Sequence, residues 1–201
     1  MIQKIAILIV AGGNSSRLGS AKQLLPFQGK TLLRRIVDEA CLDPAHSVYV
    51  VLGAEHQRMQ EELLGTKATA VLNKHWMEGM SSSISVGIHA ILKAQPELSH
   101  CIIAVCDQPF VDASLFQALK EGDEKSGRGI VTTGFAETWG TPCLFSKAYF
   151  PELLALEGPK GARPVVLMHL EDIHITPFAA AAIDVDSMTD YYNLPHRMVS
   201  V

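Results

Sequence analysis

The chain has 201 residues, of which 48% are hydrophobic and 19% charged, and 17 Lys and Arg against 21 Asp and Glu give a formal net charge of −4. This length suits one domain with a sizeable core, and the composition excludes intrinsic disorder, a collagen-like repeat and a coiled coil. The mild acidity argues against a protein that chiefly coats nucleic acid or an anionic membrane. The charge is uneven, however, because residues 1–37 contain six basic and no acidic side chains.

Four apolar runs in the first half of the chain predict strands that are buried on both faces of a parallel sheet, because polar residues do not alternate with the apolar ones. They lie at residues 4–10, 47–52, 69–72 and 101–106.

Helical patterns separate these runs, and most have a recognisable start or stop. The predicted helices are 32–41 with Thr31 as cap, 54–64 ended by Gly65, one that Ser81, Ser82 or Ser83 caps, and 113–121 with Asp112 as cap. The alternation predicts an α/β fold, a three-layer Rossmann-like arrangement with a mostly parallel sheet and helices on both faces. We expect a single domain over residues 1–201.

The pattern is less regular after residue 125. We predict short strands at 130–134 and 142–146, a helical stretch at 147–157, a turn at 158–164, a short helix at 165–170 and a last helical segment near 187–193. Residues 172–185 carry no predicted strand and lead into an Asp-Val-Asp sequence.

The four cysteines, Cys41, Cys101, Cys106 and Cys143, form no C-x-x-C pair and no zinc pattern. We interpret them as structural thiols in a reducing cytosol, and therefore expect a cytoplasmic protein. No apolar stretch reaches the ~18 residues of a membrane-spanning helix. The eight histidines show no metal-binding or catalytic spacing, and His75 and His169 are predicted to be surface or packing residues.

The loop AGGNSSRLGSAK (11–22) follows the first strand, and ligands of open α/β sheets bind beyond the carboxyl ends of the strands. Gly12 and Gly13 allow close approach of backbone amides to a ligand, while Arg17 and Lys22 offer positive charge to phosphate oxygens. The loop matches neither of the two common phosphate-binding patterns. A solvated Gly/Ser turn is the alternative, but its position and the lack of nearby carboxylates favour a phosphate site.

Carboxylates follow two other predicted segments. Asp107 ends the strand at 101–106 and is a candidate Mg²⁺ ligand, although Asp before x-Pro is also common in turns. Asp184 and Asp186 are two residues apart and can point the same way from an extended chain, so that both can join Asp107 at one ion. Alternatively, Asp186 or Ser187 serves only to cap the last helix.

Several of these segments, in this order along almost the whole chain, resemble the MobA-like nucleotidyltransferases, which attach CMP or GMP to molybdopterin. VAGGNSSRLGSAKQLLPFQGKTLL (10–33) is similar to the family's L-A-[GA]-G-x-S-x-R-M-G-x-x-K-x-L-L-P. EGMSSSISVGI (78–88), AVCDQPFV (104–111) and ALEGPKGARPVV (155–166) resemble later motifs, with Pro159 in place of an Asp. AIDVDSMTDYYNL (182–194) resembles the closing D-I-D-T-P-E-D but has Ser187-Met188 for Thr-Pro, which predicts a weakened helix cap.

The resemblance implies the nucleotide-diphospho-sugar transferase type of fold and a set of site residues. Arg17 and Lys22 would clamp the triphosphate and its pyrophosphate leaving group, and together with Asp107 they are the expected catalytic residues. Nucleotide contacts are expected from Ala11, Gly12, Gly13, Arg17, Lys22, Gly79, Ser82, Ser83 and Asp107; acceptor contacts from Lys160, Gly161 and Arg163; and Mg²⁺ ligation from Asp107, Asp184 and Asp186.

The reaction implied is transfer of a nucleoside monophosphate from an NTP to the phosphate of molybdopterin, with release of pyrophosphate. Gly12-Gly13 resembles the guanylyl enzymes, whereas Asp107-Gln108-Pro109 and the turn 161–163 resemble the cytidylyl group, so we favour CTP over GTP. The alternatives are another sugar- or alditol-phosphate nucleotidyltransferase and a non-catalytic chaperone that binds molybdenum cofactor or nucleotide. A client molybdoenzyme or its chaperone is the expected protein partner; no nucleic-acid or membrane partner is indicated.

Overall fold

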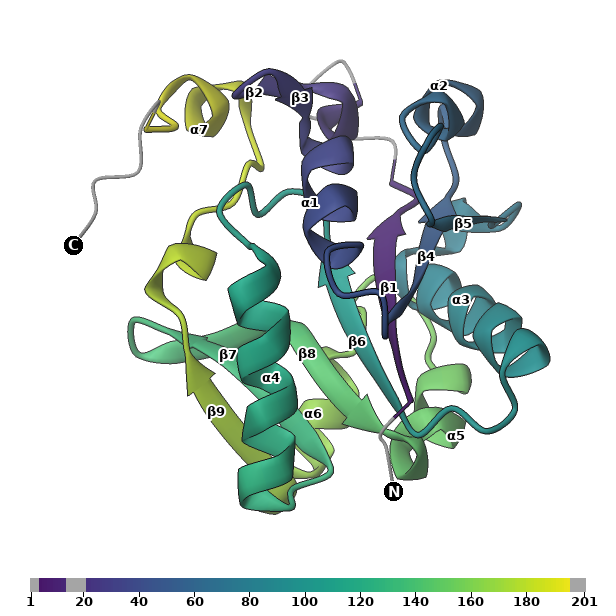
Figure 1. The fold of residues 1–201 in the computed structure, drawn as a ribbon, viewed down its shortest axis with the longest axis vertical. Helices are drawn as coiled ribbons and strands as arrows, with labels where there is room; N and C mark the ends of the chain where they lie inside the picture. Colours follow the sequence, from purple (N-terminus) through teal and green to yellow (C-terminus); the bar gives the residue numbers. More distant parts are fainter. Residues whose placement is uncertain (1–3, 14–20, 196–201) are drawn as a thin grey trace.

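The fold is built on a seven-stranded sheet in the order β5-β4-β1-β6-β8-β7-β9, in a computed structural model that describes residues 4–13 and 21–195 (Figure 1). β8 is antiparallel to β6 and β7, and the other pairs are parallel, which confirms the mostly parallel sheet. The strands are β1 (Ile5–Ala11), β4 (Ser47–Leu52), β5 (Thr69–Leu72), β6 (His100–Val105), β7 (Ile130–Phe135), β8 (Thr138–Ser146) and β9 (Ile173–Pro177), with a separate hairpin of β2 (Pro26–Phe27) and β3 (Lys30–Thr31).

Helices cover both faces of the sheet, as the alternating pattern predicts. Figure 1 shows α1 and α4 on the near face, and α3, α5 and α6 behind the sheet. The helices are α1 (Leu32–Ala40), α2 (His56–Glu61), α3 (Met80–Ala94), α4 (Ala113–Ser126), α5 (Phe150–Leu154), α6 (Arg163–Met168) and α7 (Met188–Tyr192). Single 3₁₀ turns are η1 (Lys22–Leu24), η2 (Trp76–Glu78), η3 (Lys147–Tyr149), η4 (Leu170–Asp172) and η5 (Ala179–Ala182).

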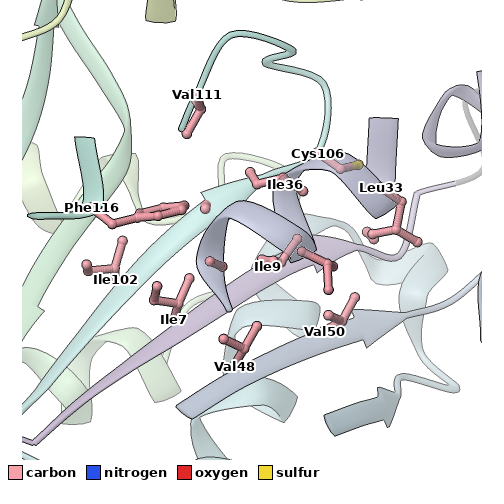
Figure 2. Packing of buried hydrophobic residues seen from close by; sticks show 14 of the residues in the cluster. Ile7, Ile9, Leu33, Ile36, Val48, Val50, Ile102, Cys106, Val111 and Phe116 are labelled. Carbon is pink, nitrogen blue, oxygen red and sulfur yellow. The ribbon is translucent and has the colours of Figure 1, made fainter. Parts of the chain in front are cut away.

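Two apolar layers hold the sheet because successive side chains of a strand point to opposite faces. Ile7 and Ile9 of β1 pack with Ile36 of α1 and Phe116 of α4 on one face (Figure 2). Leu8 belongs to the layer on the other face, under α3. All five side chains are at most 2% exposed, and burial of one such side chain stabilises the fold by about 1.5–3 kcal/mol. Strong burial on both faces explains why β1 is a continuous apolar run.

A third, smaller cluster lies beyond the carboxyl ends of the central strands. It consists of Phe27, Leu32, Phe110, Val185 and Leu194, and the rings of Phe27 and Phe110 meet edge to face. Val185 is fully buried although both of its neighbours in the chain are aspartates. This cluster therefore anchors the closing segment of the chain beside the loop that follows β6.

The structure corrects several predicted elements. α3 begins at Met80 after Gly79, whose φ of +106° suits glycine, so none of the three serines is its cap. β9 lies within residues 172–185, where no strand was predicted. α2 and α5 are shorter than the predicted 54–64 and 147–157. The last helix has an intact cap, since Ser187 and Asp190 form a reciprocal capping box.

Candidate functional site

The loop after β1 begins the candidate site. Gln23 is buried, and its Nε2 donates to the carbonyls of Ala11 at 3.1 Å and Gly13 at 2.7 Å. A Cβ on Gly12 would lie 2.9 Å from Ser83 Oγ, whereas one on Gly13 would meet nothing within 4 Å. An added side chain at Gly12 would thus crowd Ser83, whereas none of the described residues would crowd one at Gly13. The predicted Arg17 lies outside the described residues.

Lys22 and the carboxylates form the charged centre of the site. The Nζ of Lys22 donates to Asp107 Oδ2 at 2.5 Å and to Asp186 Oδ1 at 3.2 Å, joining η1 to the end of β6 and to the closing segment. Burial is the largest single influence and alone would lower the pKa of Lys22, but the charge of Asp107 and the hydrogen bonds to Asp107 and Asp186 together outweigh burial and raise that pKa above its ordinary value. The ammonium group therefore stays charged between the two carboxylates.

The closing segment carries two of the predicted metal ligands to this centre. The backbone N–H of Val185 donates to the carbonyl of Asp107 at 2.9 Å. Burial, with the charges of Asp186 and Asp107, raises the pKa of Asp184, so the three carboxylates lie near enough to repel one another. Among the described residues, no group of three or more His, Cys, Asp or Glu is arranged to hold a metal ion. In this arrangement Lys22 bridges Asp107 and Asp186.

The contacts of Asp107 bear on its two interpretations. The turn that contains Pro109 is closed by the backbone N–H of Val111, which donates to the carbonyl of Gln108 at 3.2 Å. The Asp107 carboxylate binds Lys22 instead. The Asp107 carboxylate is thus directed toward Lys22 rather than into the turn.

The predicted base-binding serines are held by a residue that the sequence analysis missed. Asn73 directly follows β5 and is 1% exposed, and its Nδ2 donates to Ser82 Oγ at 2.9 Å and Ser83 Oγ at 3.0 Å. Ser82 donates in turn to the Gly79 carbonyl at 2.8 Å. These serines hold the start of α3 against the segment that follows β5. The position of a polar residue at the carboxyl end of a strand was the signal that could have identified Asn73.

The predicted acceptor loop packs against the same end of α3. The backbone N–H of Ser81 donates to the carbonyl of Gly158 at 3.2 Å, and a Cβ on Gly79 would lie 2.6 Å from that oxygen. Beside this contact is a cavity of about 200 Å³, with Lys160, Gly161 and Arg163 in its wall. The guanidinium of Arg163 lies 4.8 Å from the centre of the Trp139 ring, which is a cation–π contact. The structure thus brings the segments predicted to contact the nucleobase and the acceptor side by side.

The other candidates occupy structural positions. His75 is exposed and 3.2 Å from Glu78, while His169 contacts Glu152 at 2.9 Å and packs on Tyr149. All four cysteines are free thiols, and three of them are buried. In the described part of the chain, no helix is long and apolar enough to cross a membrane.

A model of the MobA-like NTP transferase domain matches residues 7–173. The chain belongs to this family. A molybdenum cofactor cytidylyltransferase from Escherichia coli is 21% identical to this NTP transferase over 198 residues, which are 98% of each chain. The bifunctional protein GlmU of Coxiella burnetii is 29% identical over 141 residues, or 68% of this chain, which spans only 29% of the length of that relative.

Solved structures confirm the nucleotide-diphospho-sugar transferase type of fold. An Rv0371c homologue from Mycobacterium sp. strain JC1 has a TM-score of 0.79 and 28% identity, with 95% of both chains covered. Rv0371c of Mycobacterium tuberculosis in complex with manganese has a TM-score of 0.73 and 23% identity, with 96% of this chain and 98% of that chain covered.

Proposed function

We propose that this NTP transferase is a cytoplasmic enzyme that moves CMP from CTP to the phosphate of molybdopterin and releases pyrophosphate. The observation that carries the proposal is the Lys22 ammonium between Asp107, just beyond the carboxyl end of β6, and Asp186, while the neighbouring Gln23 binds the carbonyl of Gly13. The similarity of the E. coli cytidylyltransferase over 98% of both chains supports the choice of substrate.

Mg²⁺ is the divalent cation that the donor atoms suit best. The candidate ligands Asp107, Asp184 and Asp186 are carboxylates, and Mg²⁺ prefers oxygen ligands together with substrate phosphates. One ammonium group does not balance three carboxylates, so the cluster keeps an excess of negative charge that a divalent cation would neutralise. The manganese complex of Rv0371c is consistent with such an ion. When bound, the ion would offset negative charge on the triphosphate during transfer.

The chain's own groups would bind and orient the two substrates. Lys22 would exchange its carboxylate partners for oxygens of the triphosphate and of the departing pyrophosphate. Arg17, from the same loop, would bind those oxygens as a second cation. Backbone amides at Gly12 and Gly13 would contact the nucleotide, and Lys160 and Arg163 would hold the anionic acceptor. An oxygen of the acceptor phosphate would then attack the α-phosphorus in line, and the bond from that phosphorus to the bridging oxygen would break. This chemistry needs positioning and charge neutralisation but no covalent enzyme intermediate.

The choice of base depends on segments with opposite indications. Gln108 and the turn 161–163 resemble cytidylyl enzymes, whereas Gly12 resembles guanylyl enzymes. In the structure a side chain at Gly12 would also crowd Ser83, since an added Cβ would lie 2.9 Å from the Ser83 Oγ. Because packing gives Gly12 a second reason to be glycine, we weigh it less and retain CTP.

Pyrophosphate release with CTP, GTP or ATP, each with and without molybdopterin, tests the proposal. We expect release that needs both CTP and molybdopterin. Release with GTP would indicate the guanylyl reaction, release with a sugar or alditol phosphate would indicate another acceptor, and binding without release would indicate a chaperone. A client molybdoenzyme that receives the product would be the protein partner.

Two variants test the assigned residues in the same assay. Lys22→Ala and Asp107→Ala should each abolish pyrophosphate release, while Lys30→Ala should retain it, because Lys30 pairs with Asp38 on α1. A folded Lys22→Ala or Asp107→Ala protein with full turnover would contradict the assignments.

A further inference from the structure

The Gln108 carboxamide joins three segments that are distant in the sequence. It is buried, with only 6% of the residue exposed. Its Nε2 donates to the carbonyls of Thr141 at 3.0 Å and Ala181 at 2.9 Å, and its Oε1 accepts from Thr141 Oγ1 at 3.3 Å. Both amide hydrogens and the amide oxygen are therefore hydrogen-bonded, to residues that lie 33 and 73 positions further along the chain.

The contact with Ala181 fixes one end of the closing segment. Four residues later, the N–H of Val185 donates to the carbonyl of Asp107 at 2.9 Å, and Val185 is fully buried. Adjacent residues 107 and 108 thus hold the segment 181–185 at both of its ends. Since Asp184 and Asp186 flank Val185, these two contacts set where both carboxylates lie relative to Asp107.

The contacts with Thr141 reach the other side of the site. Thr141 lines the same cavity as Lys160 and Arg163, on strand β8. A shift of Gln108 would therefore move the cavity wall and the closing segment together. Only a glutamine side chain supplies two donors and an acceptor at this reach, because glutamate lacks the donors and asparagine is one methylene shorter.

We propose that Gln108 is a positioning residue that holds the Asp184 and Asp186 carboxylates in register with Asp107 and, through Thr141, with the acceptor cavity. The inference rests on the proposed function, in which those carboxylates bind the divalent cation and the cavity binds the acceptor. In this role Gln108 needs no contact of its own with either substrate. It acts through the residues to which it is hydrogen-bonded, as residues that orient metal ligands do in other proteins.

Gln108→Met tests the inference, because methionine is unbranched and of similar length but forms none of these hydrogen bonds. Gln117→Met is the matched control, since Gln117 is exposed on α4 and its side chain hydrogen-bonds Glu121 on the same helix. Mn²⁺ affinity is measured on each folded protein from the electron paramagnetic resonance signal of free Mn²⁺. Steady-state constants for CTP and molybdopterin, and the melting temperature, are measured in parallel.

We expect Gln108→Met to weaken Mn²⁺ binding by about 10-fold or more, the effect typical of residues that orient metal ligands. The kcat should fall by about 10–100-fold, as for a small misplacement of reacting groups. The KM for molybdopterin should rise, and the KM for CTP should change by less than about 3-fold. Gln117→Met should match the wild type throughout.

A lower melting temperature with unchanged Mn²⁺ affinity and kcat would overturn the inference, because it would show a merely structural tie. If Gln108→Met does not fold, Thr141→Val, which removes only the bond to Oε1, should shift Mn²⁺ affinity in the same direction by a smaller factor; no shift would again overturn it. Absence of pyrophosphate release by the wild type would refute the transfer reaction instead, while the Mn²⁺ comparison would still decide the role of Gln108.

Discussion

Replacement of Lys22 by methionine removes the charge at the centre of the site while nearly preserving the length of the side chain. In the wild type the ammonium group donates to Asp107 at 2.5 Å and to Asp186 at 3.2 Å. The Lys22 and Asp107 side chains are 20% and 19% exposed, whereas that of Asp186 is 63% exposed. The Asp107 contact should therefore account for most of the effect.

The expected loss of stability lies between two limits. Exposed ion pairs contribute about 0–1 kcal/mol, and removing one partner of a fully buried pair costs about 3–5 kcal/mol. Because one fifth of each side chain is exposed, we expect Lys22→Met to lower the free energy of unfolding by about 1–2 kcal/mol. For a chain of this size the melting temperature should fall by about 2–8 °C.

The pH dependence of this loss follows from the pKa of Lys22. Burial lowers this pKa, but the charge of Asp107 and the hydrogen bonds to Asp107 and Asp186 together outweigh burial, and the pKa is raised above the ordinary value of 10.5. A base whose pKa is raised on folding stabilises the protein fully below its unfolded pKa, and the contribution is lost as the pH rises through the folded pKa. The difference between wild type and Lys22→Met should hence be constant from about pH 7 to pH 9 and shrink only above the ordinary lysine pKa.

Thermal denaturation with and without Mn²⁺ distinguishes this explanation from a general packing defect. Mn²⁺ should stabilise Lys22→Met more than the wild type, because the ion meets carboxylates that no ammonium group neutralises. Lys30→Met is the control, since the Lys30 side chain is 53% exposed and its partner Asp38 lies on α1. Equal stabilisation of wild type and Lys22→Met by Mn²⁺ would refute the reasoning, as would unchanged stability of Lys22→Met in the absence of metal.

Three further variants have expected outcomes. Burial and two neighbouring carboxylates raise the pKa of Asp184, so its charged form costs stability. Asp184→Asn should therefore melt about 1–2 °C higher than the wild type at pH 7 in a thermal scan, and the gain should shrink as the pH falls toward about 4. Pyrophosphate release by this variant should fall. Gly12→Ala should lower the free energy of unfolding, measured by urea denaturation, by about 1–3 kcal/mol, and by less when Ser83 is also replaced by alanine. Additive effects of the two substitutions would show that no contact joins the two positions. Gly87→Ala on α3 would place a methyl group 2.7 Å from Leu8 Cδ2 and should also cost about 1–3 kcal/mol, partly relieved by Leu8→Ala; a wild-type urea midpoint for Gly87→Ala would contradict the close packing.

The elements that could be predicted from the sequence are those whose signal is local. Residues 4–10 and 101–106 are continuous apolar runs, and such runs mark strands that are covered on both faces, as β1 and β6 are. Thr31 and Asp112 were predicted as caps because Thr and Asp are preferred at that position. In the structure the side chain of each accepts from backbone N–H two or three residues onward.

The elements that were missed depend on distant partners. β9 is a short edge strand whose hydrogen bonds go to β7, about 40 residues earlier, and its own sequence IHITP is not distinctive. The serines of α3 were predicted as caps, but Asn73 binds two of their hydroxyl groups and Gly79 begins the helix instead. A hydrogen-bonding residue competes for several partners, and its sequence neighbourhood does not show which one it finds.

The same limit applied to the candidate site. Lys22 and Asp107 could be selected because each follows a buried strand in a motif with a known chemical use, and they meet in the structure. Gln108 stands beside Asp107 in the motif 104–111 and Asn73 follows β5, but both act through contacts with residues that are not adjacent to them in sequence. Their amide side chains carry no charge, so charge patterning gave no indication of them either.

The uneven charge of the chain has a structural as well as a chemical explanation. Three basic side chains of residues 1–37 bind acceptors that lie beyond residue 37: Lys30 and Arg34 bind Asp38, and Arg35 donates to the carbonyl of Pro109. These contacts join the β2–β3 hairpin to α1, and they join α1 to the loop after β6. Lys22 differs, because its partners include the carboxylates that are proposed to bind metal. Since a triphosphate and these carboxylates would compete for the same ammonium group, nucleotide and divalent cation should each strengthen the binding of the other.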